Sequence, residues 1–170
     1  MKIKKKLSKV LLSFFILNST NAYSKDINHD LDIFSNSLKF KTISYEDKNK
    51  FEEKEFIGFI NFIEKSYPLV HKSLKKEIIG KYSLLYKWEG KNNKNELPVI
   101  FLAHIDVVPV DKNDESKWLK KPFSGEIDDN FIWGRGTLDD KISIISLLSS
   151  TEKLLEKRFT PNKTIYFAFG

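Results

Sequence analysis

The chain has 170 residues, of which 41% are hydrophobic and 31% charged, and its formal net charge at pH 7 is +6. This composition is typical of a globular domain with a hydrophobic core, and it excludes the collagen-like and disordered classes. The sequence contains 0 cysteines, which excludes a disulfide framework, a thiolate metal site and a cysteine nucleophile. Any bound metal must therefore be held by His, Asp or Glu.

The first 24 residues have the organisation of a secretory signal peptide. Five lysines up to Lys9 form a basic start, residues 10–17 are apolar, and small or polar residues follow. Cleavage after Ala22 or after Ser24 satisfies the preference for small residues, and we favour Ser24. The apolar stretch is shorter than the roughly 20 residues that span a bilayer. The sequence predicts a signal peptide at residues 1–24 and an exported domain, periplasmic or secreted, at residues 25–170.

The alternative is that the protein stays tethered to the membrane through an uncleaved signal; once the signal is removed, we expect no stable membrane anchor. The signal also explains most of the net charge, because its five lysines are not opposed by any acid. Without them the formal charge of +6 falls to +1. A nearly neutral domain has no concentrated basic surface, so we expect no nucleic-acid partner.

The next part of the chain predicts two helices followed by two strands. Apolar residues recur at helical spacing over residues 30–40 and more strongly over residues 47–67, where Pro68 should end the helix. Two β-rich stretches follow at residues 78–88 and 97–103, joined by a polar loop. The second stretch is apolar without alternation, which predicts a central strand that is covered on both faces.

The last part of the chain predicts a hairpin, a helix and a strand. The hairpin pairs residues 126–127 with 131–133, the helix covers residues 138–158, and the final apolar strand covers residues 164–169. Alternating strands and helices indicate an α/β fold with a mostly parallel sheet flanked by helices.

His104 and Asp106 form the first motif that can carry chemistry. His104 follows the apolar strand directly, and the carboxyl ends of strands are where open α/β sheets place ligands. If the backbone stays extended, His104 and Asp106 point to the same side. Asp106 could then orient His104 as a metal ligand, bind the metal itself or steer a substrate. The alternative is a hydrogen-bonded histidine with a purely structural role.

The second motif combines a tight turn with two adjacent acids. Gly134 and Gly136 permit the turn, and Thr137 can cap the helix that follows. Asp140 occupies the capping-box position three residues after Thr137, which accounts for it without any catalytic role. Asp139 is the acid left to explain. A carboxylate can bridge two divalent ions that activate water, and oxygen and nitrogen ligands suit zinc, with cobalt or manganese as substitutes.

Residues 101–109 (FLAHIDVVP) and 133–141 (WGRGTLDDK) together resemble the dinuclear-zinc family of aminoacylases, carboxypeptidase S and glutamate carboxypeptidases. The similarity extends to residues 40–44 and 67–71, and to Trp118 with the PFSG that starts at Pro122. These segments are most similar to the carboxypeptidase S and N-acyl-amino-acid hydrolase branch. The resemblance covers nearly all of the chain from about Leu31 onward.

The resemblance implies specific roles for three residues. It makes His104 a ligand of one zinc, Asp106 the active-site carboxylate beside it, and Asp139 the bridge between both zinc ions. His29 and His71 match no ligand position of the family, so we expect them to be structural or exposed.

The resemblance also implies that much of the family's site lies outside this chain. Members of the family continue past the last predicted strand into a Glu-Glu pair, which supplies the general base and a zinc ligand, and then into further ligands and a lid domain. We therefore expect a partial zinc-peptidase domain, truncated before the second half of the sheet and the lid domain. Its unpaired sheet edges predict aggregation.

The predicted function is that of a zinc-dependent hydrolase of peptide or N-acyl-amino-acid amide bonds. With an incomplete set of ligands for the two zinc ions, the chain is expected to be inactive unless a complementing downstream polypeptide supplies the rest. The alternative is a non-catalytic exported fragment without metal-dependent activity.

Overall fold

The computed structural model describes residues 27–92, 96–128 and 130–170. The chain divides into two compact units, Met1–Asp32 and Ile33–Gly170, and the second unit carries the sheet and the candidate site. Residues 27–37 are helical, close to the predicted 30–40. The predicted signal peptide lies outside the described residues. Within the described part of the chain, no helix is long and apolar enough to cross a membrane.

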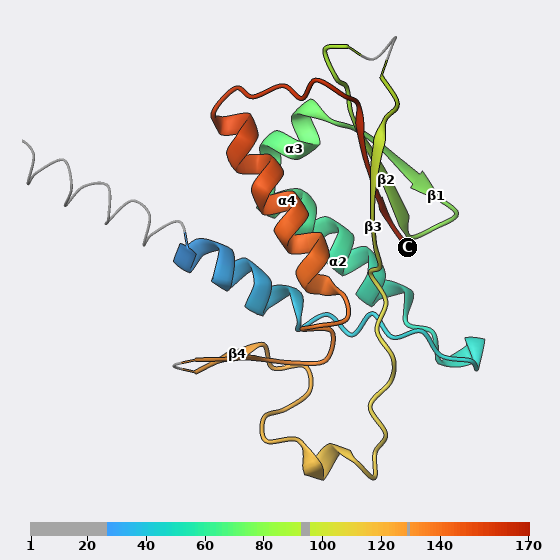
Figure 1. Cartoon of the computed structure of the whole chain (residues 1–170). Coiled ribbons are helices and arrows are strands. Elements are labelled where there is room, and N and C mark those ends of the chain that lie inside the picture. The colour runs from blue at the N-terminus through green and yellow to red at the C-terminus, as the bar shows by residue number, and fades with distance from the viewer. Residues whose placement is uncertain (1–26, 93–95, 129) are drawn as a thin grey trace, which may run out of the picture. The chain divides into compact units, whose positions relative to one another are not determined.

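The remaining elements are a mixture of helices and strands (Figure 1). In chain order they are η1 (Lys48–Lys50), α2 (Glu53–Ser66), α3 (Pro68–Ser73), β1 (Lys75–Ile79), β2 (Ser83–Trp88), β3 (Val99–Ala103), η2 (Glu115–Lys117), β4 (Glu126–Ile127), β5 (Ile132–Trp133), α4 (Lys141–Glu156) and β6 (Ile165–Phe169). The α/β class is confirmed, as are the predicted hairpin (β4 and β5) and the final strand (β6).

Four strands form the main sheet in the order β1-β2-β6-β3. β3 and β6 run parallel, with Phe101 opposite Phe167, whereas β1 pairs with β2 and β2 with β6 in antiparallel register. The expectation of a mostly parallel sheet is therefore wrong for the described strands. The reason is local: the stretch predicted as one strand over residues 78–88 contains a turn, where Gly80 has a φ of +65° that glycine adopts without strain. The chain therefore folds back as a hairpin instead of crossing over.

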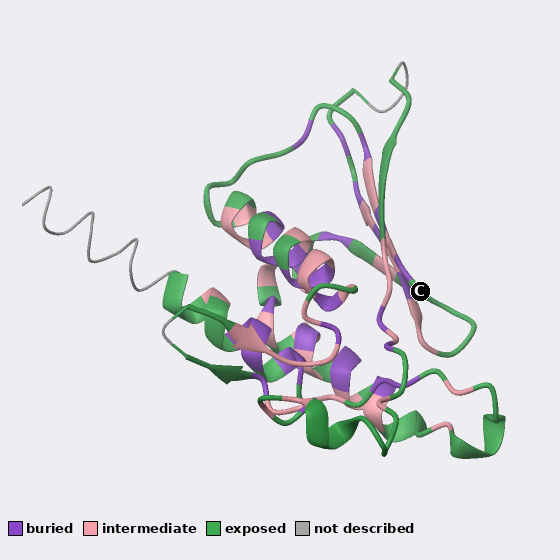
Figure 2. Ribbon diagram, turned by 60° about the horizontal axis from the view of Figure 1, so that its bottom comes forward, coloured by how far each residue is buried: buried purple, intermediate pink, exposed green. Residues whose placement is uncertain are grey.

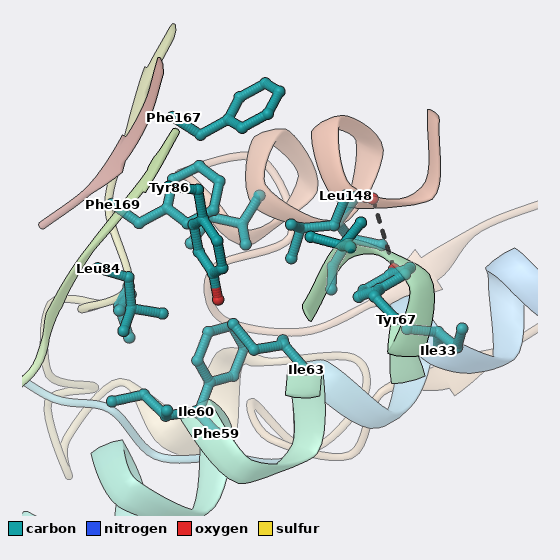
Figure 3. Close-up of a cluster of buried hydrophobic side chains, with 14 of the residues drawn as sticks. Ile33, Phe59, Ile60, Ile63, Tyr67, Leu84, Tyr86, Leu148, Phe167 and Phe169 are labelled. Carbon is teal, nitrogen blue, oxygen red and sulfur yellow. Dashed lines mark hydrogen bonds between the residues drawn. The ribbon is translucent and has the colours of Figure 1, made fainter. Parts of the chain in front are cut away.

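The helices α2, α3 and α4 pack on one face of this sheet, and the core lies between them (Figures 1 and 3). Figure 3 shows side chains from β2 and β6 directed toward α2 and α4. The fully buried side chains of this core, from both the helices and the strands, include Phe59, Ile63, Leu84, Tyr86, Leu148 and Phe169. The Tyr67 hydroxyl lies 2.9 Å from the Ser149 hydroxyl, which joins the start of α3 to α4. Burial of these apolar side chains provides the main stabilisation of the fold.

The prediction of a central, doubly covered strand over residues 97–103 is wrong. β3 lies at the edge of the sheet, and its residues from Val99 to Leu102 are exposed, with Ile100 at 57% and Leu102 at 72% (Figure 2). The apolar pattern correctly predicted a strand, but it does not specify which other elements cover the faces of that strand. In the described residues, β6 pairs with one side of β3 only.

The helix predicted over residues 47–67 is interrupted. Residues 48–50 form the short 3₁₀ helix η1, with the Asp47 side chain accepting from the Asn49 backbone N–H at 3.0 Å, and α2 begins only at Glu53. Pro68 ends α2 as predicted, and it also starts α3 because its ring fits the first turn of a helix.

The two remaining histidines agree with the expectation that they are structural or exposed. The His71 ring lies 2.7 Å (Nδ1) from the Tyr67 carbonyl oxygen and 2.9 Å (Nε2) from the Tyr86 hydroxyl, which ties α3 to β2. His29 is exposed.

Candidate active site

His104 lies at the carboxyl ends of the two parallel strands. The Gly170 N–H donates to the Ala103 carbonyl at 3.0 Å, and the Ile105 N–H donates to the Gly170 carbonyl at 2.5 Å, so pairing continues on both sides of His104. Ile105 is buried, while the His104 side chain is 40% exposed. The sheet therefore holds the backbone rigidly on both sides of an imidazole that remains accessible.

A second segment fixes the residues after His104. Thr42 is fully buried, and its hydroxyl donates to the Ile105 carbonyl at 2.7 Å while its own carbonyl accepts from the Val107 N–H at 2.8 Å. The Ser44 N–H in turn donates to the Val107 carbonyl at 3.1 Å. This pairing explains the local geometry, because the HIDV segment runs as an extended strand-like stretch beside the KTIS segment.

Asp106 contacts the His104 ring through two acceptors. The Nδ1 atom of His104 lies 3.1 Å from Asp106 Oδ1 and 3.0 Å from the Asp106 carbonyl oxygen. A carbonyl oxygen only accepts, so Nδ1 carries the proton and donates. This leaves Nε2 as the ring atom that faces away from Asp106, the arrangement in which a carboxylate orients an imidazole toward another partner.

Asp139 lies on the opposite side of the imidazole. Its Oδ1 is 2.8 Å from His104 Nε2, although the two residues are 35 positions apart in sequence. The Asp139 side chain is 84% exposed. All three residues predicted from the sequence, His104, Asp106 and Asp139, thus meet in one place.

The glycine turn places Asp139 next to the histidine segment. Gly136 has a φ of +85°, and a Cβ atom there would lie 2.7 Å from Val107 Cγ1, which is too close for any other residue. The Arg135 N–H donates to the Pro122 carbonyl at 2.5 Å, and the guanidinium lies 5.3 Å from the centre of the Trp118 ring. The turn is therefore packed directly against the segment that carries His104.

The capping box predicted for the next helix is wrong. α4 begins at Lys141, so Asp140 is its N-cap rather than its third residue, and the Asp140 side chain accepts from the Ser143 hydroxyl instead of a backbone N–H. Thr137 Oγ1 donates to the Gly134 carbonyl at 2.6 Å and so stabilises the turn. The helix starts later than predicted because the glycine turn continues through these residues.

Lys141 was not identified from the sequence, yet it supports the site. Its side chain is fully buried, and Nζ donates to the Ser37 and Phe40 carbonyls at 3.1 and 2.6 Å. It also lies 5.1 Å from the centre of the Phe59 ring. Burial lowers the pKa of Lys141 to about 7. In the sequence Lys141 appears only as the last residue of the motif at residues 133–141, and a lysine at the start of an apolar helix stripe would ordinarily be expected to be solvated.

The acids around His104 change its protonation. Partial burial lowers the pKa of His104, but the hydrogen bond that its ring donates to Asp139, the backbone contact with Asp106 and the charges of both carboxylates outweigh burial and raise the pKa above 6.5. Both ring nitrogens face acceptors, so the site favours a positive charge between Asp106 and Asp139. A metal cation on Nε2 would satisfy the same Asp139 oxygen that the imidazolium proton satisfies.

The described residues do not form a complete metal site. Among them, no group of three or more His, Asp or Glu side chains is arranged to hold an ion. His104 Nε2 and Asp139 Oδ1 are two suitable donors that face the same point, and both suit zinc. The residues present therefore fit part of a zinc site and do not fit a two-zinc centre.

Comparison with known proteins places this site in a family. Residues 100–170 match the profile of peptidase family M20/M25/M40. "Probable carboxypeptidase S-like 2" of Dictyostelium discoideum is 49% identical over 133 residues, which are 77% of this chain and 25% of that protein. "N-fatty-acyl-amino acid synthase/hydrolase PM20D1" of Xenopus tropicalis is 37% identical over 89% of this chain and 29% of its own length.

A solved structure has the same fold. The M20 family metallo-carboxypeptidase Sso-CP2 of Sulfolobus solfataricus superposes with a TM-score of 0.62 at 24% identity, covering 82% of this chain and 30% of that one. The chain spans about a quarter of the length of the relatives it matches. The profile match includes both motifs of the candidate site, and the chain therefore belongs to peptidase family M20/M25/M40, in the branch of carboxypeptidase S.

Proposed function

We propose that this chain is the amino-terminal part of a zinc-dependent hydrolase that cleaves peptide or N-acyl-amino-acid amide bonds. The observation that carries the proposal is the 2.8 Å contact between His104 Nε2 and Asp139 Oδ1, with Asp106 on the other side of the ring. Family membership supports the hydrolytic chemistry. The relatives' names, carboxypeptidase S-like and N-fatty-acyl-amino acid synthase/hydrolase, support the two substrate classes.

The three site residues have different roles in this proposal. His104 would hold one zinc through Nε2, since Nδ1 is occupied by Asp106. Asp139 would serve as the shared carboxylate of the complete metal centre, and its side chain is exposed. Asp106 is the active-site carboxylate that orients His104 and supports its basicity. Two zinc ions, with cobalt or manganese as substitutes, would act as Lewis acids on the scissile carbonyl and lower the pKa of a bound water.

The chain by itself is proposed to be inactive. The two donors that face each other, His104 Nε2 and Asp139 Oδ1, are fewer than the three that catalytic zinc sites use, and the described residues contain no larger group of ligands. A complementing polypeptide that corresponds to the rest of the family's catalytic domain would supply the other ligands. We also propose that the protein is exported through the signal peptide at residues 1–24.

Zinc titration of the purified chain by calorimetry tests the half-site. We expect one zinc per chain in the wild type, and loss of binding in both His104→Ala and Asp139→Asn. Asp140→Asn is the matched control: the neighbouring acid points to Ser143 rather than His104, so its removal should leave zinc binding unchanged. Absence of zinc binding to the wild type, or equal binding by His104→Ala, would contradict the proposal and favour the non-catalytic exported fragment.

A complementation assay tests the activity. The chain is mixed with a polypeptide that covers the remaining length of a carboxypeptidase S-like relative, and hydrolysis of N-acyl amino acids and dipeptides is measured with added zinc. Activity should require both parts and should disappear with Asp106→Asn, Asp139→Asn or a chelator. Activity that survives Asp139→Asn would rule out the proposed bridging role.

A further inference from the structure

A pocket of about 630 Å³ lies at the end of the sheet where β2 begins and β6 ends, and its lining includes none of His104, Asp106 and Asp139. Its volume is within the roughly 300–1,000 Å³ of pockets that bind small organic molecules. The lining residues come from the segment before α2 and from the turn between β1 and β2. They are Ser44, Tyr45, Lys48, Phe51, Lys81 and Tyr82.

An aromatic cluster forms the apolar wall of this pocket. The Phe51 ring stacks on Phe56 with centroids 4.7 Å apart and lies 5.2 Å from the Tyr82 ring. Phe56 is buried behind them, 5.3 Å from Tyr82, whereas Phe51 and Tyr82 are only half-buried. Burial, followed by a hydrogen bond to Glu53, raises the pKa of Tyr82. The two rings are thus held in place with part of their surface facing the pocket.

Two lysines supply positive charge at the same pocket. Lys48 and Lys81 are exposed, and neither lies within ion-pair distance of a carboxylate in the described part of the chain. The acids nearby in sequence have other partners: the Asp47 side chain caps η1, and Glu52 lies 3.0 Å from Lys54. The pocket therefore combines an apolar aromatic wall with two ammonium groups that are available to an anion.

We propose that this pocket binds a small aromatic carboxylate. Its ring would pack on Phe51 and Tyr82, and its carboxylate would pair with Lys48 and Lys81. Aromatic rings prefer offset or edge-to-face contact with other rings, which the half-exposed rings of the pocket wall offer. A neutral aromatic molecule should bind more weakly than this ligand, because only an anion is attracted by the positive charges of the two lysines. The proposal does not rest on the proposed hydrolase, since none of its three site residues lines the pocket.

Calorimetric titration with 2-naphthoate and its neutral match 2-naphthamide, at low ionic strength, tests the proposal. Naphthoate should bind the wild type about tenfold more tightly than naphthamide, because the binding free energies of two exposed ion pairs together correspond to about that ratio of affinities. The double variant Lys48→Gln/Lys81→Gln should lose that preference and bind both probes equally. Lys157→Gln is the control, because this lysine is exposed on another part of the surface.

A second variant tests the aromatic wall. Phe51→Leu keeps an apolar side chain and the packing against Phe56, and it should weaken binding of both probes by a similar factor. Three results would overturn the proposal: no binding of naphthoate to the folded wild type, equal binding of naphthoate and naphthamide to it, or unchanged naphthoate binding by the lysine double variant.

Discussion

The contact between His71 and Tyr86 offers a quantitative test of the core, because one partner is completely buried. Tyr86 is 0% exposed, and its hydroxyl lies 2.9 Å from His71 Nε2. His71 Nδ1 donates to the Tyr67 carbonyl at 2.7 Å, so Nε2 of the neutral ring accepts and the Tyr86 hydroxyl donates. Burial raises the pKa of Tyr86 far above its usual value, which keeps this donor protonated.

Removing the acceptor should cost more than removing the donor. His71→Phe leaves the Tyr86 hydroxyl buried without an acceptor, and an unsatisfied buried polar group costs ~1–3 kcal/mol. Tyr86→Phe leaves only the Nε2 atom of a half-buried imidazole, which water can reach, so we expect a loss of ~1 kcal/mol. The double variant has no unpaired group at this contact. Its loss in free energy of unfolding should therefore be ~1 kcal/mol smaller than the sum of the losses in the two single variants.

Unfolding in urea, followed by far-ultraviolet circular dichroism, gives the free energy of unfolding for each variant. For a chain of this size, each kcal/mol corresponds to roughly 2–4 °C in Tm, which provides a second measurement. His29→Phe is the control, because an exposed histidine should change stability by less than ~0.5 kcal/mol. Additive losses in the double variant, or a larger loss in Tyr86→Phe than in His71→Phe, would refute this account of the contact.

Three further predictions concern other parts of the fold. Gly125→Ala places a side chain at a φ of +61° and against a backbone carbonyl, so it should lower the free energy of unfolding in urea by roughly 2–4 kcal/mol. Gly80→Ala, at a similar φ but in open space, should lower it by only ~1 kcal/mol. Equal losses in the two variants would exclude the clash. Burial lowers the pKa of Lys141 to about 7, so above that pH the unfolded chain binds more protons than the folded chain, and the free energy of unfolding of the wild type in the presence of EDTA should rise by ~3 kcal/mol more between pH 7 and 10 than that of Lys141→Met. The control Lys157→Met should show the same rise as the wild type. An equal rise in Lys141→Met would contradict the assignment to Lys141. Leu102→Lys should shift the chain toward monomer in sedimentation velocity, because the exposed apolar edge strand favours self-association; an already monomeric wild type would contradict this.

The local elements were predictable where a single pattern determines them. The apolar stripe predicted α4 and most of α2, and two short stretches on either side of the polar residues 128–130 predicted the β4–β5 hairpin. Several of the errors occurred at turns. Gly80 divides one predicted strand into two, and the glycine turn before α4 delays the helix so that Asp140 becomes its N-cap. In each case a few backbone angles overrode the side-chain pattern.

The residues of the candidate site could be named from the sequence. The spacing of His104 and Asp106 after a strand predicted that these two side chains share a side, because a strand end restricts where a side chain can point. Only the family resemblance implied that Asp139 joins them. The family resemblance assigned them roles, which remain to be tested by the zinc titration.

Tertiary structure alone decided everything that depends on neighbours distant in sequence. It brings Asp139 within 2.8 Å of a histidine 35 residues away and places β6 between β2 and β3. It also buries Lys141 against two carbonyl oxygens and leaves β3 exposed at the edge of the sheet. The physical reason is that residue type and spacing specify backbone geometry and the polarity of a surface, whereas strand order and burial depend on which surfaces pack together.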